Sequence, residues 1–201
     1  YGASSGVLMS QSADGRFIAT RVHHPSADAY NSFVFDREAK VSPKPTTSGS
    51  HPHYRNGPML LSLNGQRYAR LDNGVVKGGG FLSSEEEVLT YAGDGVSALD
   101  ENVSTHSMSA DGCVAFAAEA TNVVASDLNN KGDIFVTQPS IANTSQRVNL
   151  GPGGAEANGN SSNPKLSTDG KWIFFLSYAT NLDGPQTGRQ LYVVANPLAG
   201  S

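Results

Sequence analysis

The 201-residue chain has little charge and almost no cysteine. Lys, Arg, Asp and Glu together make up 16% of the residues, and the 14 basic residues are scattered along the chain. A nucleic-acid partner requires a basic stripe that follows the phosphates, so the sequence predicts no nucleic-acid binding. The single cysteine, Cys113, excludes an internal disulfide and a zinc site built from cysteines. We expect Cys113 to be a buried, unreactive thiol.

Long apolar runs are also lacking. No stretch approaches the ~18 apolar residues that a membrane-spanning helix needs, so the sequence predicts no membrane span. Glycine and proline are abundant, with 22 and 10 residues. Such residues mark turns, and a turn-dense chain favours many short strands over a helical bundle. Hydrophobic residues make up 38%, which is enough for one core.

A repeated motif is the strongest signal in the sequence. Ser109-Ala-Asp-Gly leads into an apolar run and then Ala-Thr-Asn, and the same order recurs 58 residues later from Ser167. A further copy begins at Ser12, and Ser83 is interpreted as the start of a degraded fourth copy. The Asp-Gly step predicts a tight turn, because glycine accepts a positive φ without steric cost.

Strands are expected on both sides of each turn. Val7–Ser10 and Pro164–Ser167 precede turns, whereas Val114–Ala117 and Trp172–Leu176 follow them. The unbroken apolar character of the last two predicts strands that are buried on both faces. An aromatic strand then completes each copy: Ser32–Asp36, Asp133–Thr137 and Gln190–Val194.

The core residues follow from these strands. Large side chains on the repeated apolar segments are expected to be mostly buried, namely Phe116, Phe135, Trp172, Phe174 and Tyr192. A separate hairpin is predicted over residues 59–71 around Asn64-Gly65. Residues 83–92 fit either a strand or a short helix that starts at a capping box. Residues 39–57 and 151–163 are expected to form long surface loops.

The order Ser-x-Asp-Gly, apolar run, Ala-Thr-Asn, polar loop and Asp-Ile-Phe-Val resembles the WD-like, TolB-type repeats of bacterial surface and periplasmic proteins. The resemblance is close over residues 105–197 and weaker over 7–38. It implies an all-β fold of β-propeller-like blades of antiparallel strands. It also implies that the Asp-Gly pairs starting at Asp14, Asp111 and Asp169 are turns between the first two strands of a blade.

The blade count decides the domain organisation. At ~40–50 residues per blade, 201 residues give about four blades, the lower end of closed propellers. We therefore expect residues 1–201 to form a single propeller-like domain that is small or incomplete. It is either an irregular propeller, a part of a larger one, or one completed by a neighbouring chain, since open sheet edges need a partner.

Candidate catalytic residues are absent from the predicted elements. There is no Gly-x-Ser-x-Gly elbow, and none of the five histidines stands in a catalytic context. The histidine pairs at positions 23–24 and 51 and 53 suggest a metal site, but solvated loop histidines are the preferred interpretation. The sequence predicts no enzyme activity, no catalytic residues and no bound cofactor.

Calcium is the one cofactor that the sequence leaves open. Asp127, Asn129 and Asp133 place oxygen ligands at alternate positions, which suits a hard cation such as calcium. The segment fails the EF-hand pattern, because Lys131 stands where an acid is expected. The preferred alternative is that these residues form the turn into the strand over 134–136.

The expected function is a non-enzymatic, extracytoplasmic protein-interaction or scaffold module. Its partner is expected to be another protein or further copies of itself. One alternative is a structural or adhesive subunit of a cell-surface assembly, and another is the non-catalytic propeller of a larger hydrolase. Unpaired strand edges near Val7–Ser10 and Leu191–Val194 offer β-augmentation, unless these two segments pair with each other and close the ring.

Overall fold

The computed structural model describes residues 6–24, 29–40, 59–62, 64–80, 86–139, 145–184 and 187–200. Within these ranges the regular structure is all strand, apart from one 3₁₀ turn at Pro152–Gly154. No helix in the described ranges is long and apolar enough to cross a membrane. The all-β prediction is therefore confirmed.

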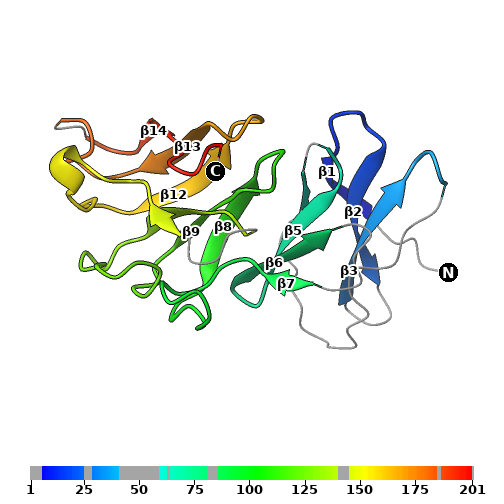
Figure 1. The fold of residues 1–201 in the computed structure, drawn as a ribbon, viewed down its shortest axis with the longest axis horizontal. Helices are drawn as coiled ribbons and strands as arrows, with labels where there is room; N and C mark the ends of the chain where they lie inside the picture. The colour runs from blue at the N-terminus through cyan, green and yellow to red at the C-terminus, as the bar shows by residue number, and fades with distance from the viewer. Residues whose placement is uncertain are drawn as a thin grey trace. The chain divides into compact units, whose positions relative to one another are not determined.

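The described strands form four antiparallel sheets, in which neighbouring strands follow one another along the chain (Figure 1). Sheet 1 contains β1 (Gly6–Gln11), β2 (Phe17–His24) and β3 (Ala29–Asp36). Sheet 2 contains β4 (Met59–Leu61), β5 (Arg67–Asp72), β6 (Val75–Gly80) and β7 (Glu87–Val88). Sheet 3 contains β8 (Val103–Met108), β9 (Val114–Ala118), β10 (Asp133–Thr137) and β11 (Gln146–Arg147). Sheet 4 contains β12 (Ser161–Leu166), β13 (Trp172–Ser177) and β14 (Gln190–Ala195).

The sheets fall into two compact units. The first unit comprises residues 1–73 and 77–87, and it holds sheet 1 with most of sheet 2. The second comprises residues 74–76 and 88–201, and it holds sheets 3 and 4. That residues 1–201 act as one domain stays a prediction.

A hydrogen-bonded turn joins the first two strands of each sheet, and the motif serine organises it. In sheet 1, Ser12 Oγ donates to Asp14 Oδ1 (2.6 Å) and accepts from the Phe17 amide (2.9 Å). In sheet 4, Ser167 Oγ donates to Asp169 Oδ1 (2.6 Å) and accepts from the Trp172 amide (3.0 Å). These side chains satisfy backbone groups that the ladder leaves free at the turn, so the predicted turn role of the motif is confirmed.

The turn of sheet 2 is built by Ser62 and Asn64. Ser62 Oγ donates to Asn64 Oδ1 (2.7 Å) and accepts from the Arg67 amide (2.9 Å), and Gly65 has a φ of 68°. An amide oxygen accepts the same bonds as a carboxylate oxygen, so Asn replaces the motif Asp. Ser62 is therefore the motif serine of sheet 2, and Ser83, which the sequence suggested for this copy, lies outside the described ranges.

The corrected repeat is nearly regular. With Ser62 included, the motif serines lie 50, 47 and 58 residues apart, close to the length of one four-stranded repeat. Of the ambiguous segment 83–92, the described residues 86–92 contain the outer strand β7 and no helix. Residues 81–85 lie outside the described ranges.

In sheets 3 and 4, the threonine of the Ala-Thr-Asn segment forms hydrogen bonds with the loop that precedes the first strand of the sheet. Asp100 accepts from the amide (2.9 Å) and the hydroxyl (2.5 Å) of Thr121. In sheet 4, Asn158 accepts from the Thr180 amide (2.8 Å) and donates to its hydroxyl (2.8 Å). The threonine of each copy thus ties the loop after the second strand to the segment that precedes the sheet.

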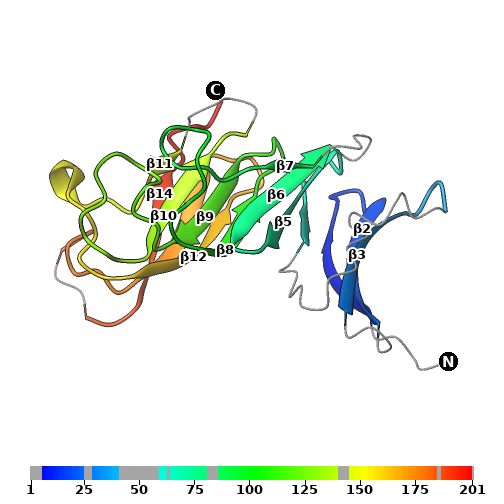
Figure 2. The ribbon, with the colours of Figure 1, turned by 90° about the horizontal axis from the view of Figure 1, so that it is seen from below.

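Sheets 3 and 4 pack together in the second unit, with β12 beside β8 (Figure 2). Their shared core is made of small and aliphatic residues of sheet 3 and aromatic and aliphatic residues of sheet 4. Its buried members are Cys113, Ala115, Ala117, Ile134, Val136, Val148, Ile173, Phe175 and Leu198. In the first unit a smaller core gathers Ala19, Val34, Met59, Leu61 and Tyr68.

One serine hydroxyl in each unit bridges two neighbouring sheets. Ser10 Oγ of β1 accepts from the Leu61 amide of β4 (2.8 Å). Ser107 Oγ of β8 accepts from the Leu166 amide of β12 (3.0 Å). Each serine lies two residues before a motif serine, and each bridge joins the two sheets of one unit.

The core predictions are confirmed for sheet 3 and partly wrong for sheet 4. Phe116 and Phe135 are fully buried, with ring centroids 5.4 Å apart. Trp172 and Phe174, by contrast, are 49% and 36% exposed, and Tyr192 is partly buried. The reason is that β13 has one face against sheet 3 and that no described layer covers the other face.

Candidate functional site

The described residues hold no catalytic constellation. The side chains of the histidines at positions 23, 24, 51 and 53 lie outside the described part of the chain, and His106 is buried on β8. Cys113 is buried, and burial raises the pKa of its thiol to about 11. Since the thiolate is the reactive form, this environment matches the expected inert thiol.

The calcium candidates gather around an arginine. Arg147 Nη2 lies 3.0 Å from Asp127 Oδ2, and Arg147 Nε lies 3.3 Å from Asp133 Oδ2. Arg147 Nη1 lies 2.5 Å from Glu156 Oε1. Asn129 donates from Nδ2 to Asp133 Oδ2 (3.1 Å) and accepts from the Lys131 amide (2.8 Å). The guanidinium therefore supplies the positive charge that the carboxylates need.

Burial dominates the electrostatics of this cluster. It raises the pKa of Asp127 and Asp133, and the charge of Arg147 opposes that rise at both. The residues described contain no group of three or more His, Cys, Asp or Glu side chains that could hold a metal. Calcium binding by Asp127, Asn129 and Asp133 stays a prediction, and it would require the guanidinium to leave.

A second buried arginine plays the same part in the first unit. Arg70 is 2% exposed, and it donates from Nε and Nη2 to Glu86 (2.7 and 2.6 Å). Its Nη2 also lies 3.2 Å from Asp72 Oδ2, and Lys77 Nζ lies 2.9 Å from the same oxygen. Both arginines therefore hold strands and loops together through ion pairs within the fold.

The main candidate for a binding surface is the uncovered face of sheet 4. Because alternate residues of a strand point to one side, Trp172, Phe174 and Leu176 share this face on β13. Their partners in the ladder are Ala195, Val193 and Leu191 of β14. Leu191 and Val193 are 65% and 49% exposed. We call these six residues the apolar face.

In sheet 3 the residues at the equivalent positions are buried, because sheet 4 covers them. The motif serine amide bonds to the carbonyl of Cys113 in sheet 3 and of Trp172 in sheet 4, which makes these residues equivalent. Ala115 then corresponds to Phe174, and their ladder partners Val136 and Val193 also correspond. Cys113, Ala115 and Val136 are at most 1% exposed, because sheet 4 packs on them.

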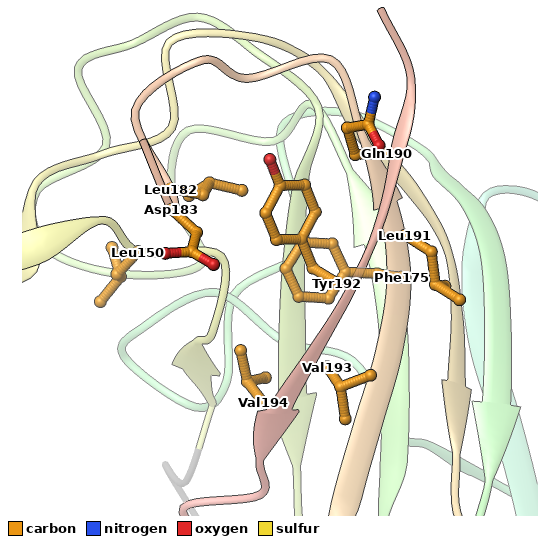
Figure 3. Close-up of a pocket in the computed structure, with 9 residues that line it drawn as sticks. All are labelled: Leu150, Phe175, Leu182, Asp183, Gln190, Leu191, Tyr192, Val193 and Val194. Carbon is orange, nitrogen blue, oxygen red and sulfur yellow. The ribbon is translucent and has the colours of Figure 1, made fainter. Parts of the chain in front are cut away.

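A groove runs along the outer edge of β14, with a volume of about 410 Å³. In Figure 3, Tyr192 and Val194 point to the same side as Leu150, Leu182 and Asp183, which come from neighbouring loops. Leu191 and Val193 point to the other side of the strand. Tyr192 stacks on Phe175, with centroids 5.6 Å apart, and this pair repeats the Phe116–Phe135 pair of sheet 3.

The predicted strand edges differ in their surroundings. In the described residues β14 pairs only with β13, whereas its counterpart β10 in sheet 3 carries β11 on the outer edge. β1 pairs with β2 in sheet 1 and β14 lies in sheet 4, so the described ladders do not join Val7–Ser10 to Leu191–Val194. Among the described strands, β11 of sheet 3 thus has no counterpart in sheet 4.

Comparison with known proteins supports the fold. No family model matches the chain, and no curated protein matches it. The structure of a putative TolB from Agrobacterium tumefaciens is 16% identical, with a TM-score of 0.57 over 96% of this chain and 58% of that chain. TolB from Acinetobacter baumannii is 14% identical, with a TM-score of 0.58 over 98% of this chain and 42% of that chain.

A protease domain shares the same architecture. The β-propeller domain of the Trilobed protease from Pyrococcus furiosus is 10% identical, with a TM-score of 0.58 over 96% of this chain and 54% of that chain. At these identities the likeness shows the fold alone. The fold is that of TolB-type β-propellers, as the motif predicts, and the chain spans less than two thirds of each of these structures.

Proposed function

We propose that this chain is a non-enzymatic protein-interaction or scaffold module that works outside the cytoplasm. The observation that carries the proposal is the apolar face of sheet 4. Its residues occupy positions that are buried between blades in sheet 3, yet Trp172, Leu191 and Val193 keep about half or more of their surface in water. Contiguous exposed apolar residues of this kind mark protein-interaction sites.

The chemistry of the described residues agrees with binding rather than catalysis. The buried charges are paired within the fold, around Arg70 and Arg147, and the thiol of Cys113 is buried. The resemblance of the motif to repeats of bacterial surface and periplasmic proteins supports a place outside the cytoplasm. The expected partner is another protein or a further copy of this chain.

The test uses the only tryptophan of the chain, Trp172, which lies on the apolar face. A partner that covers this face should shift the emission of Trp172 to shorter wavelength and protect it from an aqueous quencher such as iodide. Candidate partners come from cell-envelope extracts by cross-linking to the immobilised chain.

A matched pair of variants decides whether the face is responsible. Trp172→Glu places a charge on the apolar face, and Val96→Glu places the same charge at a residue that is 78% exposed in a loop. We expect Trp172→Glu to abolish capture of the partner and Val96→Glu to leave it unchanged. Equal capture by both variants would refute the proposal.

The two alternative functions predict different experimental results. A structural or adhesive subunit is favoured by the outer edge of β14, which pairs with no described strand, and it predicts self-association that grows with concentration. A propeller of a larger hydrolase is favoured by the likeness to the Trilobed protease domain. It predicts that the captured partner is a peptidase or another hydrolase domain.

A further inference from the structure

We infer that Asn73 is a site of spontaneous chemical modification, at which the side-chain amide is converted to aspartate and isoaspartate through a cyclic imide formed with Gly74. This inference is independent of the proposed interaction function. The chain has four Asn-Gly steps, which start at positions 56, 64, 73 and 158. The first lies outside the described ranges, so the structure distinguishes the other three.

The reaction uses only the asparagine, the glycine that follows it, and solvent. Hydroxide takes the proton of the Gly74 amide, and the nitrogen forms a bond to Cγ of Asn73 while the side-chain nitrogen leaves as ammonia. Water then adds to one of the two imide carbonyls and opens the ring, which leaves either aspartate or isoaspartate. Glycine favours ring closure because it has no Cβ to hinder the approach. A reactive step therefore needs a free amide nitrogen and a free side-chain carboxamide.

Both groups are free at Asn73 and Gly74. Asn73 is exposed, and its side chain makes no hydrogen bond to any described residue. The Gly74 amide has no acceptor in the described ranges either, and only the Gly74 carbonyl is bound, by the Val103 amide (2.7 Å). Asn73 also has a φ of 48°, which costs energy for a residue with a Cβ. The rotation that brings the nitrogen to Cγ therefore starts from a strained conformation.

At Asn64 both groups are held. Its Oδ1 accepts from the Ser62 hydroxyl (2.7 Å) and from the Gln66 amide (3.0 Å). The Gly65 amide donates to the Ser62 carbonyl (2.8 Å), which keeps the proton on the nitrogen that would attack. The side chain of Asn64 cannot turn towards Gly65 without breaking both of its hydrogen bonds, so we expect this step to react slowly.

At Asn158 the side chain is held at both of its polar atoms. Oδ1 accepts from the Thr180 amide (2.8 Å), and Nδ2 donates to the Thr180 hydroxyl (2.8 Å). The amide of Asn158 itself donates to Asn181 Oδ1 (3.0 Å). Among the three described Asn-Gly steps, Asn73 is therefore the one at which neither reacting group is bound.

The modification changes the turn between β5 and β6. Asn73 and Gly74 are the two residues of this turn, and both have a positive φ, as in a type I′ turn. Isoaspartate adds a methylene group to the main chain, so the turn cannot keep its geometry. We expect this change to weaken the hydrogen bond from the Val103 amide to the Gly74 carbonyl, at the start of β8.

Peptide mapping of the full chain tests the inference. The folded protein is kept in mildly alkaline buffer, digested with trypsin and analysed by mass spectrometry. Trypsin cleaves after Arg70 and Lys77, so Asn73 lies in a separate peptide, residues 71–77. We expect Asn73 to be converted at least about fivefold faster than Asn64 or Asn158, a factor that one or two hydrogen bonds account for. An isoaspartyl methyltransferase should label the same peptide.

Two variants separate the structural argument from the sequence pattern. Asn73→Gln should abolish the conversion in residues 71–77, because the larger ring that glutamine forms closes much more slowly. Ser62→Ala removes the hydroxyl that holds Asn64, so it should raise the rate at Asn64 and leave the rate at Asn73 unchanged. In urea, where the chain is unfolded, the three rates should become similar.

Three results would overturn the inference. They are equal rates at the three steps in the folded protein, conversion of Asn64 or Asn158 ahead of Asn73, and conversion of Asn73 only after the chain unfolds. Hydrogen exchange of the Val103 amide gives a further measurement. It should become faster in the isoaspartate form, and an unchanged exchange rate would refute the expected effect on β8.

Discussion

Two phenylalanines of the second unit should respond very differently to truncation. Phe116 is fully buried and stacks on Phe135, whereas Phe174 lies on the apolar face with 36% of its surface exposed. Phe116→Ala removes a buried ring and leaves a cavity, which costs about 3–5 kcal/mol. That is a large share of a typical total stability of ~5–15 kcal/mol.

The loss at Phe174 contains no cavity term. About two thirds of a full Phe transfer free energy of ~1.5–3 kcal/mol gives a cost of ~1–2 kcal/mol for Phe174→Ala. Urea unfolding followed by the emission of Trp172 reports on the unit that holds both residues. With a slope of ~2 kcal/mol per molar, the midpoint should fall by about 2 M for Phe116→Ala and by less than about 1 M for Phe174→Ala. A loss below about 1 kcal/mol at Phe116, or equal losses at both sites, would refute the assignment of the two faces.

Four further outcomes are expected. Cys113 should not react with a thiol reagent at pH 8 until the protein is unfolded, because burial raises its pKa to about 11; rapid reaction of the folded protein would contradict this. Hydrogen bonding to an arginine lowers the pKa of Asp36 from 3.8 to about 2. The ionised Asp36 side chain therefore contributes its full stabilisation above about pH 4, and this contribution is lost as the pH falls towards 2. In a plot of the thermal midpoint against pH, Asp36→Asn should therefore reduce the slope between pH 4 and pH 2. Ser62→Ala should cost about 1 kcal/mol in urea unfolding by removing the turn hydroxyl, whereas an unchanged midpoint would argue against its motif role. Arg147→Met should cost ~3–5 kcal/mol by stranding two buried carboxylates, and millimolar calcium should leave the wild-type melting temperature unchanged; a calcium-dependent rise would favour the cation site.

The sequence predicted the turns and strands because each turn depends on local chemistry. Ser12, Asp14 and Gly15 satisfy one another within a few residues, so their pattern is visible without the rest of the fold. The hairpin at Asn64-Gly65 is predicted as well, but its membership of the repeat is not, because Asn64 stands where the motif has Asp. Asn and Asp side-chain oxygens accept the same hydrogen bonds in these turns, so the two residues are equivalent at this position of the motif.

The binding surfaces could not be predicted in the same way. The apolar run that contains Trp172 and Phe174 has the composition of a strand buried on both faces, and only the absence of a described layer over it makes these residues exposed. Likewise, Asp127 and Asp133 have the spacing of cation ligands, but their cation is Arg147, which follows Asp133 by 14 residues. Both arrangements arise from long-range packing that local spacing does not encode.

The serine bridges described above set the relative position of the two sheets in each unit. The residue two positions before the motif serine is Ser10 in sheet 1 and Ser107 in sheet 3, but Leu60 in sheet 2 and Lys165 in sheet 4. Only the first sheet of each unit therefore carries the hydroxyl that binds the amide of the following sheet. Each hydroxyl therefore holds the strands of two neighbouring sheets at one relative height, since a slide of one sheet along the other would break its bond.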